Sequence, residues 1–294
     1  VKEIKPNGRL KLTKIGGYDW STIEGEYCAI IKRDGSTVTG TVLTTKASSH
    51  VHGQALVDLK RDEQSIEVRI DEDVRSAEAT RALGIEVGDF VALDSRTTIT
   101  PAGFIKSRHL DDKACVAILM GVAKALKESG SNLERPTYFY ISSFEEVGHG
   151  TSAGVPEGVT DIIAVDMAAV GEGQTSDEFA VTVCVKDGSG PYNYDLSSKL
   201  IEFAKSSELD YRVDIYTYYS SDVSQALRAG YDIRGALVGP GVDASHSFER
   251  LHQRSLEETA KLLLAYLLSD EWSGTSRSAR SSASCARSGN PTPR

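Results

Sequence analysis

The first hundred residues alternate between short runs of apolar and β-branched side chains and polar turns. Five of these runs are typical of β-strands, namely residues 9–15, 27–32, 37–45, 65–70 and 90–94. Asn-Gly and Asp-Gly pairs stand between some of them, as expected for turns. One helical pattern, residues 76–84, interrupts the series and ends at Gly84. The pattern predicts a small β-barrel or sandwich domain over residues 7–102.

From Phe104 onward, strand-like runs alternate with amphipathic helices. The predicted strands are residues 137–144, 160–167, 179–187, 211–219 and 233–239, and the predicted helices are 112–128, 195–207, 222–230 and 256–268. We expect Ser255 to cap the last helix, with Glu258 as its capping-box partner. This alternation predicts a layered α/β domain around a largely parallel sheet over residues 103–272.

The two ends of the chain depart from this pattern. The chain opens in a strand-like stretch without a Met, so we interpret it as a fragment and residues 1–6 as a remnant strand of the α/β domain. Residues 273–294 hold four Arg, no acidic residue and almost no large apolar side chain. Such a segment cannot form a core, so we predict a disordered or artefactual tail there.

Composition and charge narrow the class of protein. With 294 residues, 40% of them hydrophobic, the chain is long enough for one or two packed domains. The net charge of −9 argues against a nucleic-acid partner, and no apolar run approaches the roughly 18 residues that a membrane span needs. The four Cys include no Cys-x-x-Cys pair, which favours a reducing cytoplasm and argues against a thiolate zinc site.

Acidic residues and one histidine stand where predicted strands end or where the first long helix begins. They are Asp111, Asp112, Glu145, Glu146, Asp166, Asp222 and His246. In open α/β sheets, ligands gather beyond the carboxyl ends of strands. Carboxylates with an imidazole and no thiolate suit Zn²⁺, Co²⁺ or Mn²⁺. A cation there would also offset the repulsion between the adjacent Glu145 and Glu146.

Each residue taken alone also has a structural interpretation. Asp111 and Asp112 are compatible with helix capping, and Asp222 fits a capping box at the start of its helix. An isolated Asp166 is typical of a turn, and a loop histidine such as His246 is commonly solvated. Their joint placement at successive strand ends is what favours a shared metal site.

Seven short motifs occur together in a specific order along the chain. They are "IGGYDW", "LGIEVGDFV", "SRHLDDKACVA", "FEEVGHG", "AVDMAAVG", "YYSSDVSQALRAG" and "GPGVDASHSFER". Their order and spacing resemble the glutamyl/deblocking aminopeptidases that build tetrahedral assemblies, a family of dinuclear metallopeptidases. The resemblance extends from Val1 to about Leu268. It implies a three-layer α/β/α metallopeptidase domain with an inserted small β domain, and release of N-terminal residues from peptides by a metal-activated water.

The resemblance also implies a role for individual residues. Asp111 would bridge two divalent ions (Zn, Co or Mn), Glu146 and His246 would complete one site, and Asp166 would bind the second ion. Glu145 would be the general base. The three supporting or substrate-contacting residues would be Asp112, Asp222 and His149. Asp112 would be either a supporting acid or the cis-peptide partner of Asp111.

One ligand of the family pattern is absent from this sequence. The remaining ligand of the second ion is a His in a His-x-Asp motif expected upstream of Val1, and none of the histidines present has the right context to replace it. We therefore expect this chain to bind the second ion poorly or to be inactive.

The resemblance implies partners as well. We expect peptide substrates, a cytoplasmic location, and a β domain that forms dimers assembling into a dodecamer. Two alternatives stay open from the sequence. One is a catalytically impaired fragment or assembly subunit of the same family. The other is a glycoside hydrolase similar to endoglucanases, because paired carboxylates also hydrolyse glycosides.

Overall fold

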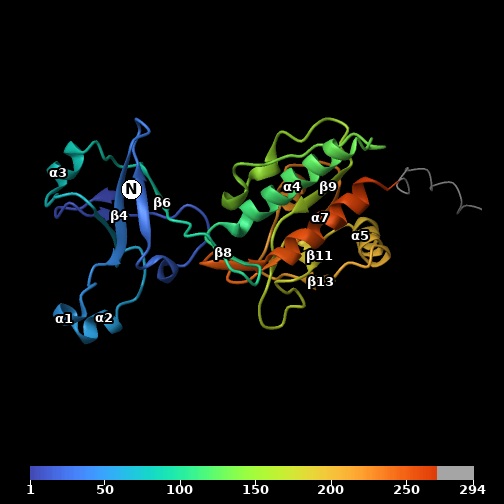
Figure 1. The fold of residues 1–294 in the computed structure, drawn as a ribbon. Helices are drawn as coiled ribbons and strands as arrows, with labels where there is room; N and C mark the ends of the chain where they lie inside the picture. Colours follow the sequence, from blue (N-terminus) through green and yellow to red (C-terminus); the bar gives the residue numbers. More distant parts are fainter. Residues whose placement is uncertain (270–294) are drawn as a thin grey trace, which may run out of the picture.

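The computed structural model describes residues 1–269, which form two parts lying end to end (Figure 1). The first part contains a six-stranded antiparallel sheet in the order β1-β2-β5-β4-β3-β6. Its strands are β1 (Glu3–Ile4), β2 (Leu10–Lys11), β3 (Tyr27–Ile31), β4 (Thr37–Thr44), β5 (Ile66–Ile70) and β6 (Phe90–Leu93). Side chains alternate along the strands, so that Ile30, Val42 and Val68 meet in a buried core. The predicted β domain is thus built around this sheet.

Strand β1 belongs to this sheet. The prediction that residues 1–6 are a strand of the α/β domain is therefore wrong. Glu3 and Ile4 pair with Lys11 and Leu10. A tight turn returns the chain between them, in which Gly8 donates its N–H to the Lys5 carbonyl at a φ of +82°. Glycine adopts this left-handed conformation without a Cβ penalty. The short Asn-Gly turn therefore determines which sheet the first residues join.

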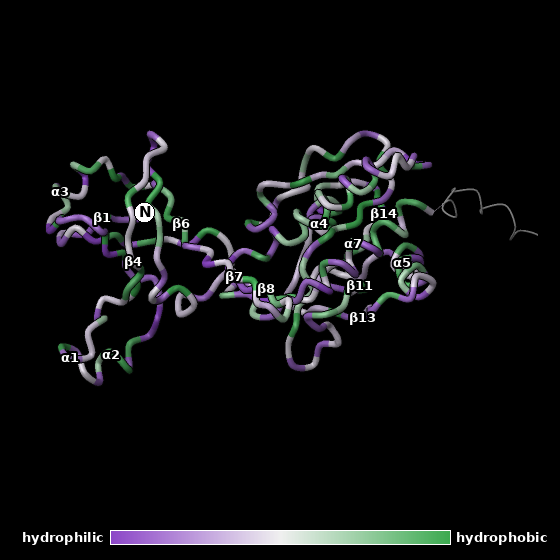
Figure 2. The backbone as a smooth tube through the Cα atoms, viewed as in Figure 1, coloured by the Kyte–Doolittle hydropathy of each residue, from purple (hydrophilic) through white to green (hydrophobic). Residues whose placement is uncertain are grey.

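Short helices complete the β part. They are η1 (Trp20–Ile23), α1 (Ser49–His52), α2 (Gln54–Val57) and the predicted α3 (Ala77–Ala82). Helices α1 and α2, which the pattern did not predict, project from the sheet (Figure 1) and are coloured as hydrophobic along part of their length (Figure 2). Val51 and Val57 on them are exposed. This projection therefore presents apolar side chains to solvent.

The second part is built on a mixed sheet. Its strands are β9 (Asp161–Val165), β10 (Ala168–Ala169), β11 (Val181–Asp187), β12 (Gly190–Pro191), β13 (Tyr211–Ile215) and β14 (Arg234–Val242). Strand β9 runs parallel to β14 and β13 parallel to β11, but β11 and β14 are antiparallel. The sheet is therefore less parallel than predicted. An apolar run indicates that both faces of a strand are buried, but it does not indicate whether the strand is parallel or antiparallel to its neighbours.

Helices cover both faces of this sheet. They are α4 (Leu110–Ser129), α5 (Tyr194–Ser206), α6 (Asp222–Arg228) and α7 (Gln253–Leu267). On one face, Ile118, Leu200 and Leu262 of α4, α5 and α7 pack with β11 and β14. On the other face, Val223 of α6 packs with Leu237. The predicted three-layer α/β/α architecture is confirmed. Figure 1 labels α4, α5 and α7, the helices of one of the layers.

Two helix starts differ from the predicted caps. Helix α7 begins at Gln253, because the His252 side chain caps it by accepting the Arg254 N–H at 3.1 Å. Ser255 lies inside the helix. At α6 the capping box is formed by Ser221 and Ser224. The carboxylate of Asp222 is therefore available for other partners.

A three-stranded antiparallel sheet follows the β part. It contains β7 (Thr98–Ile99), β8 (Phe104–Ser107) and β15 (Glu249–His252). Because β7 pairs with β8, elements of the second part begin before residue 103, inside the range predicted for the β domain. The predicted tail, residues 273–294, lies outside the described residues. Within residues 1–269, no helix has the length and apolarity to cross a membrane.

Residues 137–144 form no strand, contrary to the prediction from their aromatic and β-branched side chains. Tyr138 and Ile141 are 57% and 54% exposed. A cavity of about 920 Å³ is lined by this segment together with β9, α4 and α7. Among the described strands β9 pairs with β14 alone, so its other edge is open. A strand needs a neighbour to be stable, and residues 137–144 have none across the cavity.

Candidate metal centre

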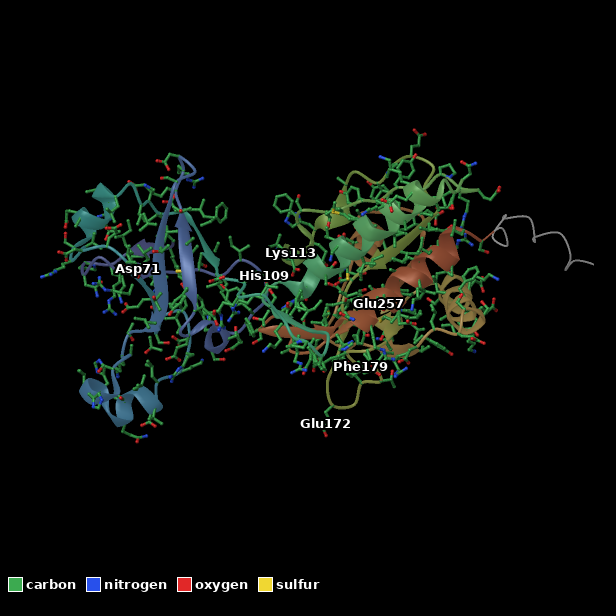
Figure 3. The ribbon with its side chains drawn as sticks, viewed as in Figure 1. Asp71, His109, Lys113, Glu172, Phe179 and Glu257 are labelled. Atoms are coloured by element: carbon green, nitrogen blue, oxygen red, sulfur yellow. The ribbon has the colours of Figure 1, made fainter. Side chains whose placement is uncertain are left out.

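One end of the cavity is built at the start of α4, where the chain departs from helical geometry. Asp111 and Asp112 have non-helical φ and ψ angles, and the peptide bond between them is cis, as the family resemblance implied. Figure 3 labels His109 and Lys113, which flank this pair, at the end of α4 nearest to the β part. The two aspartates are therefore presented at the junction of the two parts.

The first ligand group consists of Asp111, Glu146 and His246. One ligand atom from each lies within 4.8 Å of the others. The Nε2 atom of His246 is 3.3 Å from Oδ2 of Asp111 and 4.0 Å from Oε2 of Glu146. These side chains come from α4, from η2 (Glu145–Val147) and from the loop between β14 and β15. Three distant segments thus converge, as expected from their positions in the sequence.

The second ligand group consists of Asp111, Asp112 and Asp166, whose ligand atoms also lie within 4.8 Å of one another. Asp166 follows β9 and is oriented by the Met167 N–H, which donates to its Oδ1 at 2.7 Å. Oδ1 of Asp112 is buried and has no hydrogen-bond partner among the described residues. A buried unpaired carboxylate oxygen is unfavourable unless a cation or donor satisfies it. Since Asp111 belongs to both groups, the residues fit two adjacent divalent cations that share one carboxylate.

The electrostatics of the cluster are those of a site that needs positive charge. Burial raises the pKa of Glu146 to about 7, with the charge of Asp111 adding to the effect. Burial likewise raises the pKa of Asp166 well above its ordinary value. A hydrogen bond to Asp111 raises the pKa of His246 to about 9. Without a metal the cluster takes up protons, and divalent cations would replace them.

Glu145 lies beside the ligand groups without belonging to either. It lines the same cavity. Burial, together with the charges of Glu146 and Asp222, raises the pKa of Glu145 to about 7. Glu146 therefore belongs to a ligand group and Glu145 does not, although the two residues are adjacent in the sequence.

The orientation of His246 depends on a residue of the β part that the sequence did not single out. Nδ1 of His246 is hydrogen-bonded to the main-chain carbonyl of Gly17, which leaves Nε2 facing the carboxylates. Metal-binding histidines commonly donate their other ring N–H to a carbonyl or carboxylate, which fixes the tautomer. A Cβ on Gly17 would lie 3.3 Å from Nδ1, so glycine permits this approach. Gly17 lies in the "IGGYDW" motif, which the sequence analysis used only as part of the family resemblance.

Glu249 is the other residue that the sequence did not identify. It is 2% exposed and accepts hydrogen bonds from the backbone N–H groups of Asp111 and His246, both at 3.1 Å. It lies in the "GPGVDASHSFER" motif, three residues after His246, but the motif did not distinguish it from its neighbours.

Asp222 belongs to neither ligand group. Its carboxylate accepts a hydrogen bond from Oγ of Ser142 at 2.8 Å and from the N–H of Thr151 at 3.0 Å. It thus links both ends of the segment that carries Glu145 and Glu146. A Cβ on Gly150 would lie 2.1 Å from Oδ1 of Asp222, so this close approach requires glycine.

His149 is exposed and stacks on Phe144, with ring centroids 4.8 Å apart. It is not among the described residues that line the cavity or form the ligand groups. Its predicted contact with substrate stays a prediction.

A three-layer α/β/α domain joined to a β domain, with two carboxylate-rich ligand groups, is typical of metal-dependent hydrolases. Comparison with known proteins specifies the family: residues 1–262 match the model of the M42 glutamyl aminopeptidase family. The chain belongs to this family and is a metal-dependent aminopeptidase.

Individual relatives agree with this assignment. The chain is 48% identical over 269 residues to YhfE of Bacillus subtilis (strain 168), whose name describes an aminopeptidase; the match covers 92% of this chain and 78% of YhfE. Among solved structures, a TET aminopeptidase from a marine sediment Thaumarchaeota archaeon matches with a TM-score of 0.79 and 19% identity, covering 91% of this chain and 76% of that one. The Pyrococcus horikoshii TET1 peptidase, which can assemble into a tetrahedron or a large octahedral shell, matches with a TM-score of 0.78 and 21% identity, covering 91% and 79%. The two structures show a shared fold.

Proposed function

We propose that Asp111, Glu146, His246 and Asp166 hold two divalent ions and that Glu145 is the general base of the aminopeptidase reaction. The observation that carries this assignment is that Asp111 belongs to both ligand groups. Divalent ions held by these residues would lower the pKa of a bound water and polarise the scissile carbonyl. Asp112, a member of the second group with a buried, unpaired Oδ1, supports that site.

Glu145 is suited to proton transfer because it lines the cavity beside both ligand groups without belonging to either. Its carboxylate accepts a proton from the attacking water and later gives it to the leaving amine of the peptide. Asp222 supports this step by holding both ends of the glutamate segment. His149, stacked on Phe144 next to that segment, contacts the substrate.

The donor set favours Zn²⁺, Co²⁺ or Mn²⁺. The first group combines an imidazole nitrogen with two carboxylates, and the nearest thiol, Cys115, is buried with a pKa well above its ordinary value. A buried protonated thiol is not a metal ligand. The second group offers only carboxylates among the described residues, so its ion is held less tightly.

A panel of aminoacyl anilides tests the proposed function. The purified chain is assayed after treatment with a chelator and again after addition of Zn²⁺, Co²⁺ or Mn²⁺. We expect hydrolysis only with metal, and no hydrolysis of a soluble cellulose substrate. Metal binding without hydrolysis would support the alternative of a catalytically impaired chain, and metal-independent cleavage of cellulose would contradict the proposal.

We further propose that the β domain self-associates through the outer face of β3 and β6, as a step toward the dodecamer. Ile31 and Phe90 are cross-strand neighbours there, and Tyr27, Ile31 and Phe90 are 65%, 37% and 57% exposed. An exposed apolar cluster of this kind favours a protein contact. One related solved structure is described as a dodecamer. Phe90→Lys should yield smaller particles in light scattering, whereas Tyr194→Lys, at an 83% exposed position on α5, should not.

A cytoplasmic location is consistent with the cysteines. Cys28, Cys115 and Cys184 are buried free thiols. A reducing compartment keeps such thiols unpaired. Fractionation of cells that produce the protein would test this location, and recovery in a secreted fraction would contradict it.

A further inference from the structure

Among residues 1–269, Glu249 is a buried carboxylate whose hydrogen bonds all come from backbone N–H groups. Oε2 accepts the N–H of Leu110 at 2.5 Å and that of Asp111 at 3.1 Å, and Oε1 accepts the N–H of His246 at 3.1 Å. The side chain is 2% exposed, and no ion pair with Glu249 occurs among residues 1–269. Burying a carboxylate is costly, and three amide donors offset only part of this cost, since burial still raises the pKa of Glu249 to about 7.

The three donors belong to two segments that lie far apart in the sequence. Asp111 and His246 are separated by 135 positions, yet the two oxygens of one carboxylate contact the backbone of both. Both segments have irregular backbones, since His109 and His246 each have a φ of 62°. Neither donor N–H is used in a regular helix or strand ladder. Glu249 is one of the groups that bridge the two segments, together with Ser245, whose Oγ donates to Oδ2 of Asp111 at 3.1 Å, and Arg108, which donates to the Ser247 carbonyl at 3.4 Å.

Glu249 itself lies on a well-fixed element. It is the first residue of β15, whose partner across the ladder is Ser107 of β8. The loop that carries His246 is closed just behind it by reciprocal backbone hydrogen bonds between Asp243 and Arg250. The carboxylate is thus anchored on the sheet, and the two metal-ligand segments are oriented relative to it.

We propose that Glu249 is a positioning residue that sets the spacing of Asp111 and His246, and thereby the metal affinity of the first ligand group. This inference rests on the proposed function of that group. Glutamate suits the position because each oxygen of the ionised carboxylate can accept hydrogen bonds. In Glu249→Gln, one acceptor becomes an NH₂ group that faces an N–H donor, which removes one contact and repels it. In Glu249→Asp, the shorter side chain cannot reach both segments at once.

Titration of the metal-free protein with Co²⁺, followed by calorimetry and visible absorption, tests the proposal. We expect Glu249→Gln to weaken Co²⁺ binding at the tighter site by about 10–100-fold, the range typical of groups that orient metal ligands. The Co²⁺ absorption spectrum should change, and the lost kcat/KM should partly return at high Co²⁺. Glu249→Asp serves as the second variant if the Gln variant does not fold.

Asp214→Asn is the matched control. Asp214 is also a buried carboxylate, accepting the N–H groups of Thr175 and Ser176 at 2.9 and 2.8 Å, but it is not part of the metal centre. A purely structural role would lower the melting temperature of both metal-free variants and leave the Co²⁺ affinity of each at the wild-type value. Wild-type affinity and spectrum in a folded Glu249 variant would overturn the inference. Absence of Co²⁺ binding in the wild-type chain would instead overturn the proposed function.

Discussion

The main-chain carbonyl of Gly17 is hydrogen-bonded to Nδ1 of His246, although the two residues belong to different parts of the molecule. Gly17 lies between β2 and η1 of the β part, and His246 follows β14 of the α/β/α part. Through this contact the β part fixes which ring nitrogen faces Asp111 and Glu146. The β part therefore contributes to the proposed metal centre as well as to the proposed assembly.

Gly17→Ala should weaken metal binding. The added Cβ would lie 3.3 Å from Nδ1 of His246, closer than the ring tolerates without moving. We expect a loss of affinity within the roughly 10–100-fold range of second-layer changes, measured by calorimetry. Gly121→Ala is the control, because a Cβ there meets no atom within 4 Å and α4 should gain up to about 1 kcal/mol of stability. Equal metal affinity in both variants would exclude an orienting role for Gly17.

Glu145→Gln should abolish turnover while the metals stay bound. The amide keeps the shape of the side chain but cannot accept a proton, so kcat should fall by about 10²–10⁴-fold. Metal content after dialysis should match the wild type, because Glu145 belongs to neither ligand group. Glu157→Gln changes another acid of the cavity lining and should leave kcat nearly unaltered. Substantial residual activity in Glu145→Gln would remove this residue from the base role.

Asp111→Asn should impair both metal sites at once. Its carboxylate belongs to both ligand groups, whereas Asp166 belongs only to the second. Elemental analysis should therefore find neither ion retained in Asp111→Asn and one ion retained in Asp166→Asn. The loss of metal affinity in Asp111→Asn should exceed the roughly 10–100-fold loss that is typical when a group that only orients ligands is changed. Retention of one tightly bound ion in Asp111→Asn would show that this residue does not bridge.

The wild-type chain should bind its two ions with unequal affinity. The first group supplies an imidazole nitrogen, and the second supplies only carboxylates within residues 1–269. Calorimetric titration with Zn²⁺ should thus resolve one tight and one weak step. Two equally tight steps would contradict this expectation.

The stabilising effect of metal should increase with pH. The pKa values of Glu145 and Glu146 are raised from 4.5 to about 7, so their contribution to the stability of the metal-free fold is present below pH 4.5 and lost as the pH rises through 7. The pKa of His246 is raised from 6.5 to about 9, so its contribution is present below pH 6.5 and lost as the pH rises through 9. The contributions of the two glutamates and of His246 to the stability of the metal-free fold therefore both decrease as the pH rises.

Melting temperatures with and without Mn²⁺, measured from pH 5 to pH 9, test this dependence. Bound cations replace the protons that the cluster loses, so the difference in melting temperature should grow along the series. A difference that stays constant or shrinks would show that these groups do not control the stability of the site.

Much of the fold was predictable because hydrophobic periodicity reports burial directly. The range of α4 and the strands β3, β4 and β5 agree closely with the predicted ranges. Pairing was not predictable in the same way. Residues 137–144 have every local property of a strand, but a ladder partner is not encoded in local composition.

The ligand groups were predictable for a different reason. Asp111, Glu146, Asp166 and His246 are chemically distinctive and stand next to element boundaries. Glu249 is equally acidic, but its partners are backbone N–H groups, which carry no sequence signal. Gly17 likewise acts through a carbonyl that every residue possesses. Contacts made by the main chain become visible only in three dimensions.

The open edge of β9 has a consequence for handling the protein in solution. An unpaired strand edge beside the exposed aromatic run Tyr138–Tyr140 is a template for intermolecular β-pairing. Association at this edge would be open-ended, unlike a closed particle, and would grow with concentration and warming. Turbidity and thioflavin fluorescence thus become the signals to follow when the chain is stored or concentrated.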